Sequence, residues 1–290
     1  MFHQPPTASN LLQRLSGNME GAVFYHLRAG RAMILLELQK EDRRTDKPLK
    51  GFLLELYAYL ALVGNITINS HQRTICLDPF LFSLDSLKEY ETFGCMFGCA
   101  SKLFEIIPSV CLLGRNRVLV SKQEQADPTF EQYQALQTTI KNWRPPQDME
   151  AGTEYHRQLV IAAQIYQQGL LIFLHASFFT SQIDDPGVYS ARLPELEIEH
   201  HTDKMFELID TISEEAASTI LWPMIIMGSC LRSPTKQKKL REMWATSLFR
   251  MTSLSRVIQL LDWLWDDPTA FGPHGLEIVM RKHKVNFCMA

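Results

Sequence analysis

The order of apolar and polar positions predicts helices along almost the whole chain. Apolar side chains recur three and four residues apart in one segment after another, which places them on one face of a helix. Short alternating runs of the kind found in strands occur at 65–69 and 117–121, and neither has the turn residues of a hairpin beside it. We therefore expect an all-α protein of about ten helices. The main predicted helices lie at 17–41, 52–63, 127–143, 153–179, 203–216, 217–231, 235–251 and 253–267.

Proline and capping residues set several of the expected helix ends. Asp127-Pro128 and Ser233-Pro234 each pair a capping residue with a proline at the first helical position, where a missing N–H loses no partner. In the helix at 253–267 an apolar stripe of four residues precedes Pro268, which should end it. Residues 183–201 are expected to form a loop, and the next helix should begin after a cap at Thr202 or Asp203.

Composition adds the broad class. A chain of 290 residues that is 46% hydrophobic can bury a large core, and we expect one domain over 1–290 with a soft boundary near 145–152. A net charge of -3 gives no general basic field for nucleic acid. No secretory signal and no run of about 18 apolar residues is found, so we expect no membrane partner and reduced cysteines.

Two cysteines in "FGCMFGCASK", Cys95 and Cys99, have a C-x-x-x-C spacing that could belong to a metal site or to a packed helix. A structural zinc ion needs about four ligands, usually from a second close pair, and the other four cysteines are isolated in the sequence. We expect the two cysteines to share one helix face as small buried residues.

A run of acidic residues and histidines at 195–203 also resembles a set of metal ligands. Adjacent histidines such as His200 and His201 rarely point at one ion, so we interpret the run as a solvated loop and helix start. His175, within an apolar segment, is interpreted as a satisfied core histidine. Nucleophile-elbow, phosphate-loop and dinucleotide motifs are not found, and we assign no catalytic residue, no cofactor and no metal.

One local basic feature remains. The sequence "KKLR" fits a loose nuclear-import pattern, although a solvated helix face is the more common explanation, because such short basic runs are frequent by chance. Lysines in the first turn of a helix oppose its dipole by a few tenths of a kcal/mol, roughly, which slightly favours a use for them. The candidate import patch consists of Lys236, Lys238, Lys239 and Arg241.

Several segments, in order, resemble the regulatory domain of fungal-specific transcription factors. Each is mainly an apolar helical pattern, and their shared order from about residue 20 to the C-terminus carries the resemblance. The segments are "FYHLRAGRAMILL", "FLLELYAYLALVGNIT", "FGCMFGCASKLFEIIPSVCLLGR", "YQQGLLIFLH", "ILWPMIIMGSCLRS" and "VIQLLDWLWDD". The fourth is similar to the family's Tyr-x-x-Ala-x-Leu-Ile-Tyr-Leu helix, and the fifth to its Leu-Trp-Pro-Leu-x-x-x-Gly signature.

The resemblance implies an all-helical domain that receives regulatory signals and switches a metabolic or specialised-metabolite gene set. The six closely spaced cysteines of the family's zinc-cluster DNA-binding module are not found, and the domain begins late. We therefore expect a nuclear regulator that does not bind DNA specifically by itself. It would act through the transcription machinery, a DNA-binding regulator or a sensed small molecule, and could be a homodimer, a fragment or a shortened form.

The alternative is an enzyme or ligand-binding protein, in the cytoplasm, that uses the same helical domain for an apolar metabolite. Acidic and aromatic residues on adjoining helices could line a cavity for such a molecule, although core packing would explain them as well. They are Glu55, Tyr57, Tyr59, Trp222 and Trp244.

Overall fold

The computed structural model of the chain describes residues 22–38, 47–64, 66–67, 78–120, 128–147, 152–179, 192–213, 216, 218–245 and 254–285. These residues form helices joined by turns and contain no strand, which confirms the prediction of an all-α, multi-helix protein. The alternating run at 117–120 is the end of a helix. In chain order the elements are α2 (Ala22–Leu38), α3 (Lys47–Val63), η2 (Pro79–Phe82), η3 (Asp85–Leu87), α4 (Ser101–Phe104), α5 (Ile107–Val120), α6 (Pro128–Asn142), α8 (Glu154–Phe179), α9 (Arg192–Ile209), η5 (Ser218–Ile220), α11 (Leu221–Ser229), α12 (Pro234–Ala245), α13 (Leu254–Asp266) and α14 (Gly272–Lys282).

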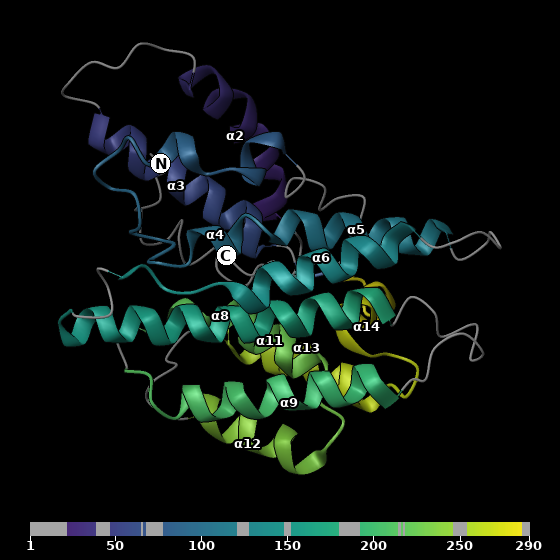
Figure 1. Cartoon of the computed structure of the whole chain (residues 1–290). Coiled ribbons are helices and arrows are strands. Elements are labelled where there is room, and N and C mark those ends of the chain that lie inside the picture. Colours follow the sequence, from purple (N-terminus) through teal and green to yellow (C-terminus); the bar gives the residue numbers. More distant parts are fainter. Residues whose placement is uncertain are drawn as a thin grey trace, which may run out of the picture.

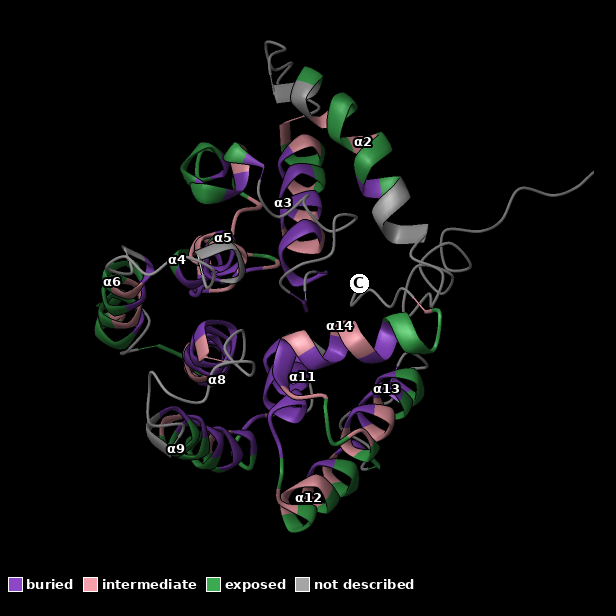
Figure 2. Ribbon diagram, turned by 90° about the vertical axis from the view of Figure 1, so that its right-hand side faces the viewer, coloured by how far each residue is buried: buried purple, intermediate pink, exposed green. Residues whose placement is uncertain are grey.

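Helix α8 is the centre of the fold. Helices α5 and α6 pack on one side of it and α9 on the other, and α11 and α14 close a third side (Figure 1; Figure 2). By length and composition alone, its 26 residues could cross a membrane. Of the 18-residue apolar stretch within it, however, 72% is buried inside the protein. Packing within the domain therefore accounts for its apolar composition.

The helix ends predicted from prolines are confirmed. Helix α6 begins at Pro128 and α12 at Pro234, although Asp127 lies outside the described residues. Helix α13 ends before Pro268, and its predicted stripe is buried in the core. The stripe consists of Val257, Leu260, Leu261 and Leu264.

Two predictions about local structure are wrong. Helix α9 already begins at Arg192, so residues 192–201 are not a loop and neither Thr202 nor Asp203 is a cap. Its buried face includes the polar residues His201 and Thr202, which interrupt the apolar pattern that would have revealed the helix. The second error concerns residues 91–99, which form a series of turns and not a helix.

The turns at 91–99 depend on two glycines. Gly94 and Gly98 have φ values of 101° and 53°, in the left-handed region that other residues rarely adopt. A helix through this segment would need negative φ at both positions. Cys95 is exposed and Cys99 buried, so the two cysteines do not share one helix face.

Helices α8 and α11 approach each other closely at one point. A Cβ atom added at Gly169 would lie 3.0 Å from the Cα of Pro223 and would also overlap the proline ring. Beside this contact the ring of Trp222 stacks on Tyr166, with centroids 5.9 Å apart and planes 4° apart. Because glycine has no side chain, the backbones of α8 and α11 can meet at this point. Both helices belong to segments that carry the family resemblance.

Candidate functional site

A cavity of about 360 Å³ lies between the turns that precede α4 and the N-terminal half of α8. Most of its wall is apolar, with small side chains on the α8 side that leave the space open. Pockets of this size and composition suit small apolar molecules. The lining residues that form the apolar wall are Met96, Phe97, Ala100, Phe104, Leu159, Ala162 and Ala163.

Glu55 of α3 holds the turn segment that forms one wall of this cavity. Its Oε1 atom accepts hydrogen bonds from the backbone N–H groups of Gly94 at 3.0 Å, Met96 at 2.8 Å and Phe97 at 3.3 Å. The side chain is 1% exposed. A buried carboxylate that accepts several N–H groups is a strong anchor, because each bond is charge-assisted. Glu55 therefore supports the cavity wall from behind.

The polar groups at the cavity mostly bond to the protein itself. Gln158 accepts from the Ser213 backbone N–H at 2.7 Å and donates to Glu154 at 2.8 Å. The Tyr166 hydroxyl donates to the Thr219 carbonyl oxygen at 2.9 Å, and burial raises its pKa well above the ordinary value. Hydrogen bonds from Arg157 and Gln158 lower the pKa of Glu154, so a negative charge stands at the rim. The cavity therefore offers mainly shape and apolar contact to a ligand.

The residues predicted to line a cavity are placed elsewhere. None of the five is among the described residues that line this one. Trp222, Trp244 and Tyr57 are core side chains, and desolvation raises the pKa of Tyr57 to about 12. Tyr59 packs behind the wall, with its ring 6.1 Å from that of Phe97. The alanines of α8 could not be predicted as lining residues, because small residues in an apolar helix do not indicate whether a cavity lies beside them.

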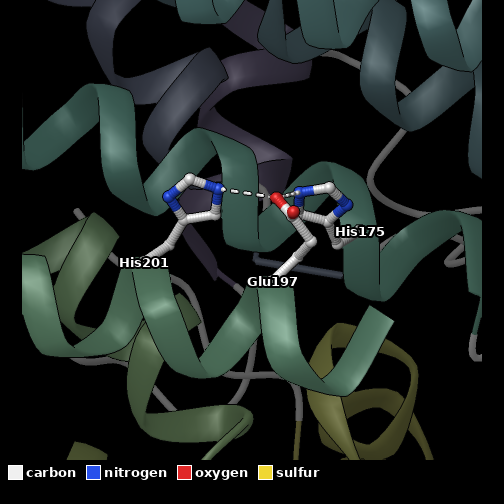
Figure 3. Close-up of side chains that lie close together, drawn as sticks. All are labelled: His175, Glu197 and His201. Carbon is white, nitrogen blue, oxygen red and sulfur yellow. Dashed lines mark ion pairs between the residues drawn. The ribbon is translucent and has the colours of Figure 1, made fainter. Parts of the chain in front are cut away.

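A second site lies between α8 and α9. Figure 3 shows the carboxylate of Glu197 between the imidazole rings of His175 and His201. Glu197 Oε2 is 3.9 Å from His175 Nε2 and 3.6 Å from His201 Nε2. The candidate ligand atoms of the three residues all lie within 4.8 Å of one another. His175 comes from α8, while Glu197 and His201 are four residues apart on α9 and share one face of it.

Each histidine of this second site is held by a hydrogen bond at its other nitrogen. His175 Nδ1 is 2.8 Å from the Tyr133 hydroxyl, and His201 Nδ1 is 2.7 Å from Gln168 Oε1. Burial lowers the pKa of His175 to about 4 and that of His201 to about 3. Both rings are therefore neutral at pH 7.

The interpretation of the run at 195–203 as solvated is right for Glu195, Glu199, His200 and Asp203, which are exposed, and wrong for His201. His175 is a core histidine as expected, but only one of its ring nitrogens has a hydrogen-bond partner. His201 is buried, and the Nε2 atoms of His175 and His201 are buried without a hydrogen-bond partner. The signal that could have indicated the pair on α9 is its Glu-x-x-x-His spacing, which brings both side chains to one face of a helix. His175 is distant in the sequence, so no local pattern could have joined it to them.

The four basic residues of the candidate import patch all lie on α12, and each is close to a carboxylate. Most of the partners belong to α9, to the turn after it or to α13. Exposed pairs of this kind contribute about 0–1 kcal/mol each, so they can open at small cost. The import function stays a prediction. The pairs are Lys236 with Glu199 and Asp203, Lys238 with Glu242 at 3.6 Å, Lys239 with Asp210 at 3.2 Å, and Arg241 with Asp262 at 2.5 Å.

Comparison with known families identifies the class of protein. A model of the fungal-specific transcription factor domain matches residues 9–288. The chain belongs to this family, which confirms the resemblance found in the sequence and gives the protein a transcription-regulator-like role. No curated protein and no solved structure matches the chain.

Proposed function

We propose that this protein regulates a metabolic or specialised-metabolite gene set by sensing a small apolar molecule. The molecule would bind in the cavity beside α8, and the signal would pass to DNA through a partner that carries the DNA-binding module. The observation that carries the proposal is the apolar cavity itself, built by the segment at 93–104 that belongs to the family pattern. Its wall is anchored to α3 by Glu55, so a ligand would couple α3 to α8.

Binding would favour one packing of the wall over another. The segment from 91 to 99 is a series of turns and not a regular helix. A ligand shifts the equilibrium only by the difference in its affinity for the two packings. Apolar contact with Phe97 and Phe104, whose rings are 4.8 Å apart, supplies such a difference if those rings move.

Filling the cavity tests its role in binding. Ala162→Phe places a ring in the space, so an apolar fluorescent probe such as N-phenyl-1-naphthylamine should bind the purified wild type and not the variant. Leu196→Phe on the exposed face of α9 is the matched control and should bind the probe normally. Equal binding by the wild type and Ala162→Phe would locate the probe outside the cavity.

The regulatory role is tested in a deletion strain by measuring transcripts and metabolites together. Transcripts of one gene set should change, and the wild-type gene should restore them while the Ala162→Phe allele should not. A lost late product with unchanged transcripts would show an enzyme instead.

Nuclear location is part of the proposal. A fluorescent fusion should gather in the nucleus, and replacing Lys238, Lys239 and Arg241 together with alanine should move it to the cytoplasm. If the triple replacement leaves the location unchanged, α12 is not the import signal. That result would not affect the proposed role of the cavity.

A further inference from the structure

We propose that His175, Glu197 and His201 form a binding site for a zinc-type divalent metal ion that joins α8 to α9. The three donors, two imidazole nitrogens and one carboxylate oxygen, are a set that zinc uses where it keeps a fourth position open. The proposal concerns a different face of α8 from the cavity and does not depend on the ligand proposed there.

The donor atoms are already close to the arrangement that an ion needs. Zinc–ligand bonds of about 2.0–2.1 Å in a tetrahedron place neighbouring donor atoms about 3.4 Å apart. The two distances from Glu197 Oε2 to the imidazole Nε2 atoms are 3.6 and 3.9 Å. Small rotations of the three side chains would close the set around an ion. These distances are too long for hydrogen bonds, so the carboxylate does not satisfy either ring.

The two unpartnered nitrogens point to a missing ligand. His175 is 0% and His201 4% exposed, and the Nε2 atom of each is buried with no hydrogen-bond partner. A buried polar atom without a partner calls for an explanation, and an ion is one of them. Two such atoms facing one carboxylate are explained together by one cation.

The outer contacts prepare both rings to bind a metal. Gln168 Oε1 can only accept, so His201 carries its proton on Nδ1 and its Nε2 presents a lone pair. The Tyr133 hydroxyl can accept from His175 Nδ1 in the same way. Partners of this kind, which fix the tautomer and orient the ring, usually accompany metal-binding histidines.

Solvent reaches the site from one side. Glu197 is 43% exposed and lies at the edge of an open depression of about 390 Å³, so an ion has an entry path and a free coordination position. Lys141 of α6 is in the same depression, with its Nζ 3.3 Å from Glu197 Oε2. Its ammonium group competes with an ion for the carboxylate and must move when the ion binds.

A titration with Co²⁺ alone, followed by Zn²⁺, tests the site. The full chain without a tag is treated with a chelator, and Co²⁺ is added while the visible d–d absorption is recorded. We expect one Co²⁺ per chain, displaced by one Zn²⁺, and a higher melting temperature with either ion, because the ion binds only the folded state. Since losing an outer partner of a ligand already weakens binding about 10–100-fold, His201→Ala should weaken it by at least about tenfold.

Two further variants separate a metal site from a merely structural cluster. Lys141→Met removes a positive charge beside the ion and should tighten binding by about tenfold. A cluster that serves only packing would show no such gain, and Lys141 is exposed enough that the variant should fold. The matched control is His26→Ala, because His26 is exposed on α2 and is not among the three candidate ligands. It should bind Co²⁺ as the wild type does.

The assignment is overturned by any of three results. Folded wild-type protein could give no d–d absorption, His201→Ala could bind Co²⁺ as tightly as the wild type, or His26→Ala could lose binding. If circular dichroism shows that His201→Ala does not fold, the comparison of Lys141→Met with the wild type decides, and equal affinities then refute the site.

Discussion

The carboxylate of Glu55 should be one of the most sensitive single positions in the protein. Replacing it by alanine leaves the backbone N–H groups of Gly94, Met96 and Phe97 without their acceptor in a buried setting. A hydrogen bond to a charged group contributes about 1.5–3 kcal/mol. The three bonds share one oxygen, and the burial of that charge opposes them, so we expect Glu55→Ala to lower the free energy of unfolding by roughly 3–5 kcal/mol.

Glu55→Gln keeps an acceptor oxygen in place and loses the charge. Since charge-assisted bonds are about twice as strong as neutral ones, its loss should be roughly 1–2 kcal/mol. Urea unfolding followed by circular dichroism measures both changes as shifts of the midpoint. Glu207→Ala, exposed on α9, is the control and should change stability by less than about 0.5 kcal/mol.

Two outcomes would refute this account of Glu55. A loss below about 1 kcal/mol for Glu55→Ala would mean that the turn segment finds other acceptors. Equal losses for alanine and glutamine would mean that the charge, and not the acceptor geometry, sets the stability. The same order of variants is expected for ligand binding: the apolar probe should bind the wild type most tightly and Glu55→Ala most weakly.

Three further predictions concern other parts of the fold. Gly169→Ala should destabilise the protein by about 1–3 kcal/mol in urea unfolding, because its methyl group would overlap the backbone of α11, whereas Gly30→Ala, with open space around it, should stabilise α2 by about 0.5–1 kcal/mol. Acidification from pH 8 to pH 5 should lower the free energy of unfolding by roughly 2 kcal/mol for each of His175 and His201. The two histidines bind protons below about pH 6.5 in the unfolded chain, while their folded pKa values are about 4 and about 3, so stability should keep falling towards pH 4. A double variant with glutamine at both positions should remove most of this dependence of stability on pH. Cys95, exposed at the cavity, should react with a thiol reagent in the native state and be protected by a bound apolar ligand; unchanged labelling with the ligand present would place the ligand elsewhere.

The sequence was informative where one local rule decided the structure. Helix α13 could be predicted because its four buried residues recur at helical spacing and a proline follows. The starts of α6 and α12 could be predicted because proline is restricted to the first turn of a helix.

Prediction failed where tertiary packing overrode the local rule. Helix α14 contains Gly272, Pro273 and Gly275 near its start, which indicate a turn when read locally. A Cβ at Gly275 would lie 2.8 Å from the carbonyl carbon of Ala270, so close packing with the preceding turn requires this glycine. Packing between helices likewise explains why the start of α9 was missed.

The candidate sites were predictable only in part. The segment at 93–102 was singled out by its glycines and cysteines, but the cavity depends on how it packs against alanines of α8. The second site needs His175 next to α9, which only the fold provides. The buried face of α9 also contains polar residues, so its apolar pattern is incomplete and does not indicate a helix.

The contact between Gly169 and Pro223 has a consequence for how this chain diverges from its relatives. Position 169 is not free to change by itself, because a side chain there meets the ring and backbone of Pro223. Where a relative has alanine at the position of Gly169, as the family pattern does, its α8 and α11 must stand further apart or the proline must shift. The family signature keeps the proline beside that alanine, so the spacing of the two helices is expected to differ between this chain and its relatives. A chimera that exchanges one of these helices without the other should fold less well than one that exchanges both.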